Sequence, residues 1–426
     1  MKRIIILSIA SMLSIASLLA AGGENDKAIA KNDTANYTEI LGKIVDSKTA
    51  EPVIFATIVI TETNIATVSN TDGEFILKIP KGKESGTISF LHLGYENTVI
   101  NISELNGGKN FVKLRAAALP IDEVVIRSLS AEELILSALN KVKDNYSINP
   151  EMQTSFYRET IKQRKKYVSV SEAVMDIYKA PYRTTFDSDR IKIYKGRKSR
   201  DVKKMDTVMV KLQGGPRTSL MLDLVKNPGD VIGPEMMKYY HFKLNGITMI
   251  DNRETYVIKF DQLPNVEYPL YSGNIYIDVE TEAFAGMNFG LSEVGLPYAS
   301  EVLVKKKPSN LKIDIEKGHY LIRYRKGADA WYLNYVRSEL ALESKWKRKL
   351  FKSDYHIMLE MAVTDRDNEN VTKIPMKESL KSNEVFTDKV TSFEDDNFWG
   401  DYNTIKPDES IEVAIKKLNK KVKRRQ

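Results

Sequence analysis

The four histidines are the residues best suited to acid–base chemistry or metal binding, and the sequence keeps them far apart. None is followed by glutamate at the spacing of the usual zinc motifs; the set is His92, His241, His319 and His356. The chain has no cysteine, which excludes thiol catalysis, thiolate zinc sites and iron–sulfur clusters. It also lacks the Gly-x-Ser-x-Gly elbow of many hydrolases. We therefore predict no catalytic residue, no metal site and no cofactor.

Aromatic side chains form a second group of candidates. Residues 319–337 can be folded as a hairpin about Gly327–Ala328. This register places three pairs on one face of an antiparallel sheet: Tyr324 with Trp331, Ile322 with Leu333, and Tyr320 with Tyr335. We predict that this face binds a ligand through Tyr320, Tyr324, Trp331 and Tyr335, with packing in the hydrophobic core as the alternative.

The stretch 345–352, KWKRKLFK, combines basic and aromatic residues more densely than its surroundings. At a hairpin tip, its aromatic rings would enter a lipid headgroup layer while its cations meet phosphate. We predict that Trp346, Arg348 and Phe351 contact a membrane or a partner. The alternative is an edge strand that its lysines protect from unwanted pairing.

Long strands and a few helices must position these residues. From about 154 to 365 the pattern is mostly that of strands, and residues 355–363 alternate with one apolar face. Ser130 and Glu133 form a capping box that predicts a helix over 130–146, and a second helix is expected over 408–422. We predict a large curved antiparallel sheet with both helices over its concave side. The sequence FEDDNFWGDYN before the last helix either anchors that helix or marks a partner surface.

Residues 42–126 contain short alternating strands separated by turn clusters. They read GKIVDSKTAEPVIFATIVI, then VSNTDGEFILKIP, then ISFLHLGYE, and end in LPIDEVVI. This run resembles the carboxypeptidase regulatory-like domain, a prealbumin-like β-sandwich found in proteins of the Gram-negative envelope. The resemblance implies a docking or bracing module over residues 39–128. In TonB-dependent transporters the same domain leads into a plug and a barrel, which we do not expect after residue 128.

The N-terminus has the order of a secretory signal peptide. Lys2 and Arg3 precede an apolar stretch that ends in Ala20, Ala21 and Gly22. We predict a signal peptide over 1–22, with an uncleaved membrane anchor as the alternative, and a flexible polar lead over 23–38. The protein is therefore expected in the periplasm or at the outer membrane.

The net charge of +7 is concentrated at the chain ends. The C-terminal KKLNKKVKRRQ contains seven basic residues and no acidic one, and Lys2 and Arg3 lie in the predicted signal peptide. A basic tail of this kind, in an exported protein, does not indicate nucleic-acid binding.

These observations predict a mainly β protein: a prealbumin-like sandwich, then a β-rich domain over 129–426 with a few packing helices. We expect a non-catalytic envelope protein whose sandwich docks or braces and whose second domain binds a lipid, glycan or protein partner. Two alternatives stay open. One is a hydrolase of envelope polymers with a carboxylate pair that the sequence does not locate, and the other is an accessory subunit of a TonB-dependent transporter.

Overall fold

The computed structural model describes residues 36–105, 108–117, 130–182, 187–200, 215–304, 309–347, 350–382, 384–392 and 398–423. The predicted signal peptide, most of the predicted lead and the segment 119–126 lie outside these residues. The first strand begins at Tyr37, inside the predicted lead. Within the described ranges, no helix combines the length and hydrophobicity needed to cross a bilayer.

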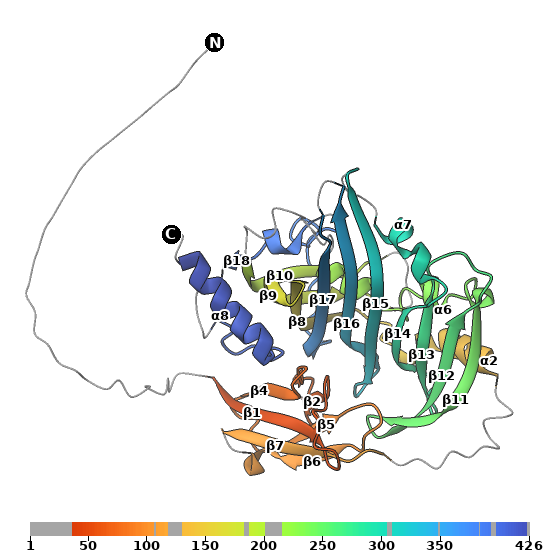
Figure 1. Cartoon of the computed structure of the whole chain (residues 1–426). Coiled ribbons are helices and arrows are strands. Elements are labelled where there is room, and N and C mark those ends of the chain that lie inside the picture. Colours follow the sequence, from red (N-terminus) through yellow and green to blue (C-terminus); the bar gives the residue numbers. More distant parts are fainter. Residues whose placement is uncertain are drawn as a thin grey trace, which may run out of the picture. The chain divides into compact units, whose positions relative to one another are not determined.

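The N-terminal region is a sandwich of two small sheets, as predicted (Figure 1). One sheet has the order β4-β1-β7 and the other β3-β2-β5-β6. Their bounds are β1 Tyr37–Asp46, β2 Thr57–Ile60, β3 Ala66–Val68, β4 Glu74–Pro80, β5 Thr87–Leu91, β6 Thr98–Asn101 and β7 Lys109–Leu114, with the short helix η1 at Ile102–Glu104. Alternate side chains of both sheets meet in a buried core, where the Phe75 and Phe90 rings lie edge to face at 5.6 Å.

The Asp72–Gly73 pair forms the tight turn before β4. Gly73 has a φ of 74°, which residues with a side chain rarely adopt. The Asn70 carboxamide oxygen accepts hydrogen bonds from the backbone N–H groups of Asp72 and Glu74, at 2.9 and 2.8 Å. This local turn chemistry fixes the register of the sandwich at β4.

The second region contains an eleven-stranded sheet in the order β11-β12-β13-β14-β15-β16-β17-β8-β9-β10-β18. Ten strands pair antiparallel with their neighbours, and β18 joins the edge of β10 in parallel. The bounds are β8 Glu151–Gln163, β9 Lys166–Lys179, β10 Arg190–Arg200, β11 Tyr240–Ile250, β12 Arg253–Gln262, β13 Tyr271–Asp278, β14 Phe284–Leu291, β15 Leu311–Lys326, β16 Trp331–Trp346, β17 Ser353–Asp367 and β18 Thr391–Ser392. The predicted large antiparallel sheet is therefore confirmed.

Short helices pack on one face of this sheet: α2 Ala131–Asn140, α3 Val142–Asn145, α5 Pro216–Met221, α6 Gly229–Ile232, η2 Met237–Tyr239 and η4 Phe386–Asp388. Two more, η3 Leu296–Tyr298 and α7 Ala299–Leu303, lie beside β15. The Ser130 hydroxyl oxygen caps α2 by accepting from the backbone N–H of Glu133 at 3.2 Å. Apolar side chains of α2 and of alternate sheet residues form the main core on this face.

The last helix, α8 (Glu409–Lys423), packs on the opposite face, beside β9 and β10 (Figure 1). Its Ile411 contacts Met358 of β17 and Val170 of β9. Ile357 and Leu359, the strand neighbours of Met358, point into the main core instead. The prediction that both helices cover one face is therefore wrong. The helix α2 packs on the main core, whereas α8 buries its apolar stripe against side chains on the opposite face of the sheet.

The register predicted for 319–337 is also wrong. The N–H of Gly327 donates to the carbonyl of Ala330 at 2.9 Å, so the turn is centred one residue later than predicted. Tyr324 pairs with Leu333 and Arg323 with Tyr335, which leaves Asn334 as the extra residue of a β-bulge. A bulge reverses the alternation of side chains beyond it. Tyr335 therefore lies on the face opposite Tyr324.

Candidate functional site

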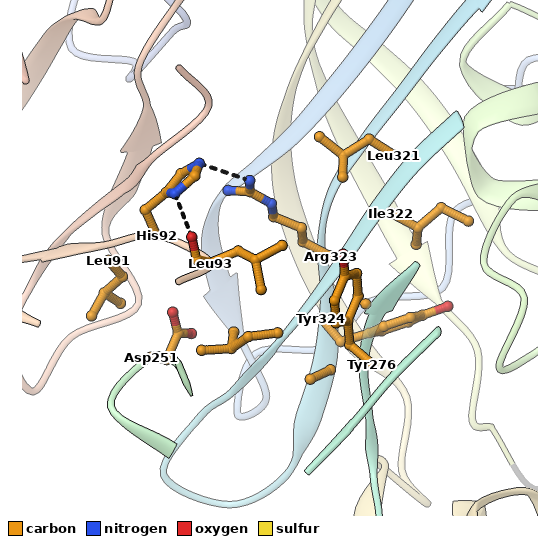
Figure 2. Close-up of a pocket in the computed structure, with 12 residues that line it drawn as sticks. Leu91, His92, Leu93, Asp251, Tyr276, Leu321, Ile322, Arg323 and Tyr324 are labelled. Atoms are coloured by element: carbon orange, nitrogen blue, oxygen red, sulfur yellow. Dashed lines mark hydrogen bonds between the residues drawn. The ribbon is translucent and has the colours of Figure 1, made fainter. Parts of the chain in front are cut away.

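A small cavity lies where the sandwich meets the large sheet. It is lined by Leu91, His92 and Leu93 of the sandwich, by the turn at Ile250–Asp251, and by residues of β13, β14 and β15 (Figure 2). Its volume is about 20 Å³, enough for about one water molecule. This cavity belongs to a packed joint and is too small to bind an organic ligand.

Arg323 and His92 form the polar contact of this joint (Figure 2). A guanidinium nitrogen of Arg323 lies 3.2 Å from His92 Nε2, while His92 Nδ1 lies 2.9 Å from the carbonyl oxygen of Leu93. Burial, with the nearby charge of Arg323, lowers the pKa of His92 to about 3. The neutral ring therefore donates from Nδ1 to Leu93 and accepts at Nε2 from Arg323. Arg323 also donates to the carbonyl of Phe55.

Further contacts hold the sandwich against the same face of the sheet. The Phe55 ring stacks on Tyr335 at a centroid distance of 5.8 Å and lies 4.6 Å from the Arg337 guanidinium carbon. Asn334, the bulge residue, donates to the Thr57 hydroxyl at 3.1 Å. The segment before α8 fills the rest of the contact, since the Thr67 hydroxyl donates to the carbonyl of Thr404 at 3.1 Å. The sandwich is thus braced on the sheet by buried aromatic and polar contacts.

An open recess lies along the outer edge of β10. Its volume is about 640 Å³, within the range of binding sites for small organic ligands. Five lysines and two glutamates line it: Lys192, Lys195, Lys377, Lys381, Lys389, Glu378 and Glu384. Lys192 binds Glu378 at 2.9 Å, and Lys389 binds Glu384 at 2.7 Å. The other three lysines have no carboxylate within 4 Å among the residues that the structure describes, so the recess has an excess of positive charge.

Two paired segments close the ends of this β10 edge. Leu380 donates its backbone N–H to the carbonyl of Ile191 at 2.8 Å, and β18 pairs with Arg197 and Lys198. Between them, residues 192–195 pair with β9 on one side and have no strand partner on the outer side within the described part of the chain. A β-bulge at Tyr194 breaks the regular ladder there. The edge is therefore too short and too irregular to pair with a long added strand.

A second recess, of about 530 Å³, adjoins the first at Tyr194 and Lys195, which line both. Its lining includes three aromatic residues, Tyr194, Tyr402 and the nearly buried Trp399. The Tyr194 and Tyr402 rings are 5.0 Å apart, and Tyr194 is 56% exposed. Asp365 and Asp401 also line this recess. Burial raises the pKa of Asp365, although the Arg366 N–H donates to its carboxylate at 2.8 Å. We call the two recesses together the β10 groove.

The residues of the groove escaped the sequence analysis, apart from the aromatic loop at 398–402. They come from the sandwich, from β8, β10 and β17, from 377–389 and from 398–403, so that no local motif contains them. The alternation of lysines in RIKIYKGRK of β10 was the available signal.

The four predicted ligand-binding residues do not form one surface. Tyr324 and Trp331 are each only 2% exposed in the main core, where Tyr320 also packs, with its ring 5.1 Å from that of Phe289. The Tyr324 hydroxyl donates to buried Asp223 at 2.9 Å. Tyr335 is buried on the other face and donates to Glu360 at 3.1 Å. Their contacts are those of core residues.

The predicted contact residues at 345–352 have different environments. Phe351 is 78% exposed, as a hairpin tip requires. Trp346 is partly buried and packs against the main core, whereas Arg348 lies outside the described residues. Among the residues that are described, no group of three or more histidine, aspartate or glutamate side chains could hold a metal ion.

Comparison with known proteins identifies one region of the chain. Residues 40–126 match the family described as CarboxypepD_reg-like domain. No curated protein matches the chain. Among solved structures, a DUF1329 family protein from Desulfovibrio piger ATCC 29098 is similar at 12% sequence identity, over 58% of this chain and 95% of that chain, with a TM-score of 0.21. Residues 40–126, which contain all but the first three residues of the two small sheets, are therefore a carboxypeptidase regulatory-like domain.

Proposed function

We propose that this protein is a non-catalytic binding protein of the Gram-negative envelope that holds an acidic glycan in the β10 groove. The observation that carries the proposal is the junction of the two recesses at Lys195, which has no carboxylate partner among the described residues, and the exposed ring of Tyr194. The regulatory-like domain would brace the sheet that carries the groove. The basic, apolar and small-residue order of residues 1–22 supports an exported protein.

The two halves of the groove suit two features of an acidic sugar polymer. Lysine ammonium groups bind carboxylate, sulfate or phosphate groups as flexible point charges. The electron-rich faces of exposed Tyr194 and half-buried Tyr402 favour the partially positive C–H groups of sugar rings, whereas Trp399 is buried beneath Arg197 and supports this wall from behind. A chain that carries both features would contact the lysines in one recess and the aromatic rings in the other.

Lipid and peptide ligands fit the groove less well. An acyl chain needs an enclosed apolar cavity, whereas both recesses are open and have many polar groups. An acidic peptide could bind the lysines, but the closed ends and the Tyr194 bulge leave little edge for strand pairing. The groove therefore favours a glycan over either rival.

Affinity electrophoresis in native gels tests the proposal. We expect polygalacturonate in the gel to retard the protein, dextran to leave its mobility unchanged, and poly-glutamate to have a weaker effect than polygalacturonate. Tyr194→Ala changes no charge and should weaken the retardation severalfold. Equal retardation by poly-glutamate and polygalacturonate, unchanged by Tyr194→Ala, would show a nonspecific response to negative charge and overturn the assignment.

A hydrolase of the same polymer is the second candidate. It is favoured by the presence of Asp365 and Asp401 in one open recess and by the raised pKa of Asp365, which suits a general acid. Incubation with acidic oligosaccharides separates the two functions. New reducing ends that disappear in Asp365→Asn would establish the hydrolase, whereas binding without cleavage would support the non-catalytic role.

A further inference from the structure

A pair of consecutive apolar residues is exposed at one end of the large sheet. Leu350 is 91% exposed and Phe351 is 78% exposed, the two highest values among the large hydrophobic residues of the described chain. Both lie in the connection between β16 and β17, where the last pair of the ladder is Ser344 with Ser353. Exposed residues of this kind at a loop tip contact no core of their own.

Exposed cations surround this tip. Lys345 and Lys347 precede it, and Lys352 follows it and is bound to Glu343 at 2.7 Å. The turn between β8 and β9 adds Arg164, Lys165 and Lys166, all exposed. Arg164 donates its N–H to the carbonyl of Asp354 at 2.7 Å, which holds this turn beside the start of β17. We call these six cations, with Leu350 and Phe351, the basic tip.

The basic tip lies at the end of the sheet away from the joint. Leu311 of β15 pairs with Trp346 at this end, whereas Arg323 contacts the sandwich near the other end of the same strand. No residue of the basic tip lines the β10 groove. An object that contacts the basic tip would therefore leave both the joint and the groove uncovered.

We propose that the basic tip is a contact with the surface of an anionic lipid bilayer, into which Leu350 and Phe351 insert. Apolar side chains at a loop tip enter the boundary between headgroups and acyl chains, while nearby lysines and arginines bind lipid phosphate. The charge complementarity selects an anionic surface. Trp346 packs into the main core and takes no part in the insertion. This inference does not depend on the glycan proposal.

Co-sedimentation of the full chain with vesicles tests it. We expect binding to vesicles of phosphatidylcholine mixed with phosphatidylglycerol, weaker binding to phosphatidylcholine alone, and a loss of binding with added salt. The double variant Leu350→Ser and Phe351→Ser changes no charge, and its partition coefficient should fall about tenfold. The matched control is Met221→Ser and Phe111→Ser, at residues 67% and 66% exposed elsewhere; its binding should equal that of the wild type.

Three results would overturn the inference. The first is no binding of the wild type to either kind of vesicle, which would indicate that the basic tip contacts a protein partner and not a bilayer. The second is equal binding to anionic and neutral vesicles. The third is an equal partition coefficient for the tip variant and the control variant. Circular dichroism of both double variants should match the wild type, because all four substituted side chains are exposed.

Discussion

Arg158 Nη1 lies 2.9 Å from Glu360 Oε1 in the middle of the large sheet, and the two side chains are 1% and 3% exposed. Arg158 also binds Glu172 at 2.7 Å and donates to the carbonyl of Ile405 at 2.7 Å. Burial alone would raise the pKa of Glu172, but Arg158 and Arg197 hold it below its ordinary value. The network joins β8, β9 and β17 to the segment before α8, on the face that carries the sandwich.

Replacing Arg158 should destabilise the protein strongly. Arg158→Met would remove the cation shared by two buried carboxylates. Because Arg197 still binds Glu172 and Arg337 still binds Glu360, the cost should lie near the lower end of the range for a broken buried pair, about 3 kcal/mol. The measurement is the unfolding temperature by differential scanning calorimetry. Arg164→Met, at an exposed arginine, is the matched control and should change the temperature little. Similar unfolding temperatures for the two variants would contradict a structural role for the network.

The buried carboxyl of Glu159 predicts a specific pH dependence of stability. Burial raises its pKa from 4.5 to about 7, although the hydroxyl of Tyr157 donates to it at 3.2 Å. The folded state therefore favours the neutral form. Below pH 4.5 the group is neutral in both states; between pH 4.5 and 7 the unfolded state loses its proton first, and stability falls. Above pH 7 the free energy of unfolding is lower by up to about 3 kcal/mol than it is below pH 4.5.

Glu159→Gln removes this penalty. The variant should unfold at a higher temperature than the wild type at pH 8, and the difference should shrink as the pH falls towards 4.5. Glu316→Gln, at an exposed residue of β15, is the control and should show no such trend. A difference between Glu159→Gln and the wild type that is constant across this pH range would contradict the buried, protonated carboxyl.

Arg323 should determine how tightly the regulatory-like domain is held. Arg323→Leu would leave the carbonyl of Phe55 and the Nε2 atom of His92 without a donor, at a cost of about 1–3 kcal/mol. Amide hydrogen exchange should then become faster in the sandwich strands β2 and β3 and stay unchanged in β12. The control is Arg115→Leu, at an exposed residue of the sandwich. Equal exchange in both variants would mean that the joint does not depend on Arg323.

Local signals in the sequence were sufficient to predict the sandwich. Its strands are short, its turns contain residues such as Gly73, and its pattern is that of a known family. The single extra residue Asn334 left no such signal, because the apolar alternation of Trp331, Leu333 and Tyr335 continues in the sequence although the bulge turns Tyr335 to the other face. The prediction of a single aromatic face failed at that residue.

The groove could not be predicted for a different reason. Lys195, Lys381 and Tyr402 are far apart in the sequence, and Lys381 and Tyr402 share recesses with Lys195 only because the segments 377–389 and 398–403 return to β10. Each lysine by itself is indistinguishable from a solvated surface lysine. Their shared location depends on the order of strands in the sheet, which the residue pattern does not contain.

Isothermal titration calorimetry with oligogalacturonate tests the central claim most directly. The wild type should bind, and Lys195→Glu should weaken the affinity at least about tenfold, since it places a negative charge where both recesses meet. Lys113→Glu, an identical charge change at an exposed residue of β7, should bind as the wild type does. Equal affinities of Lys195→Glu and Lys113→Glu, or no binding by the wild type, would contradict the assignment of the β10 groove as the glycan site.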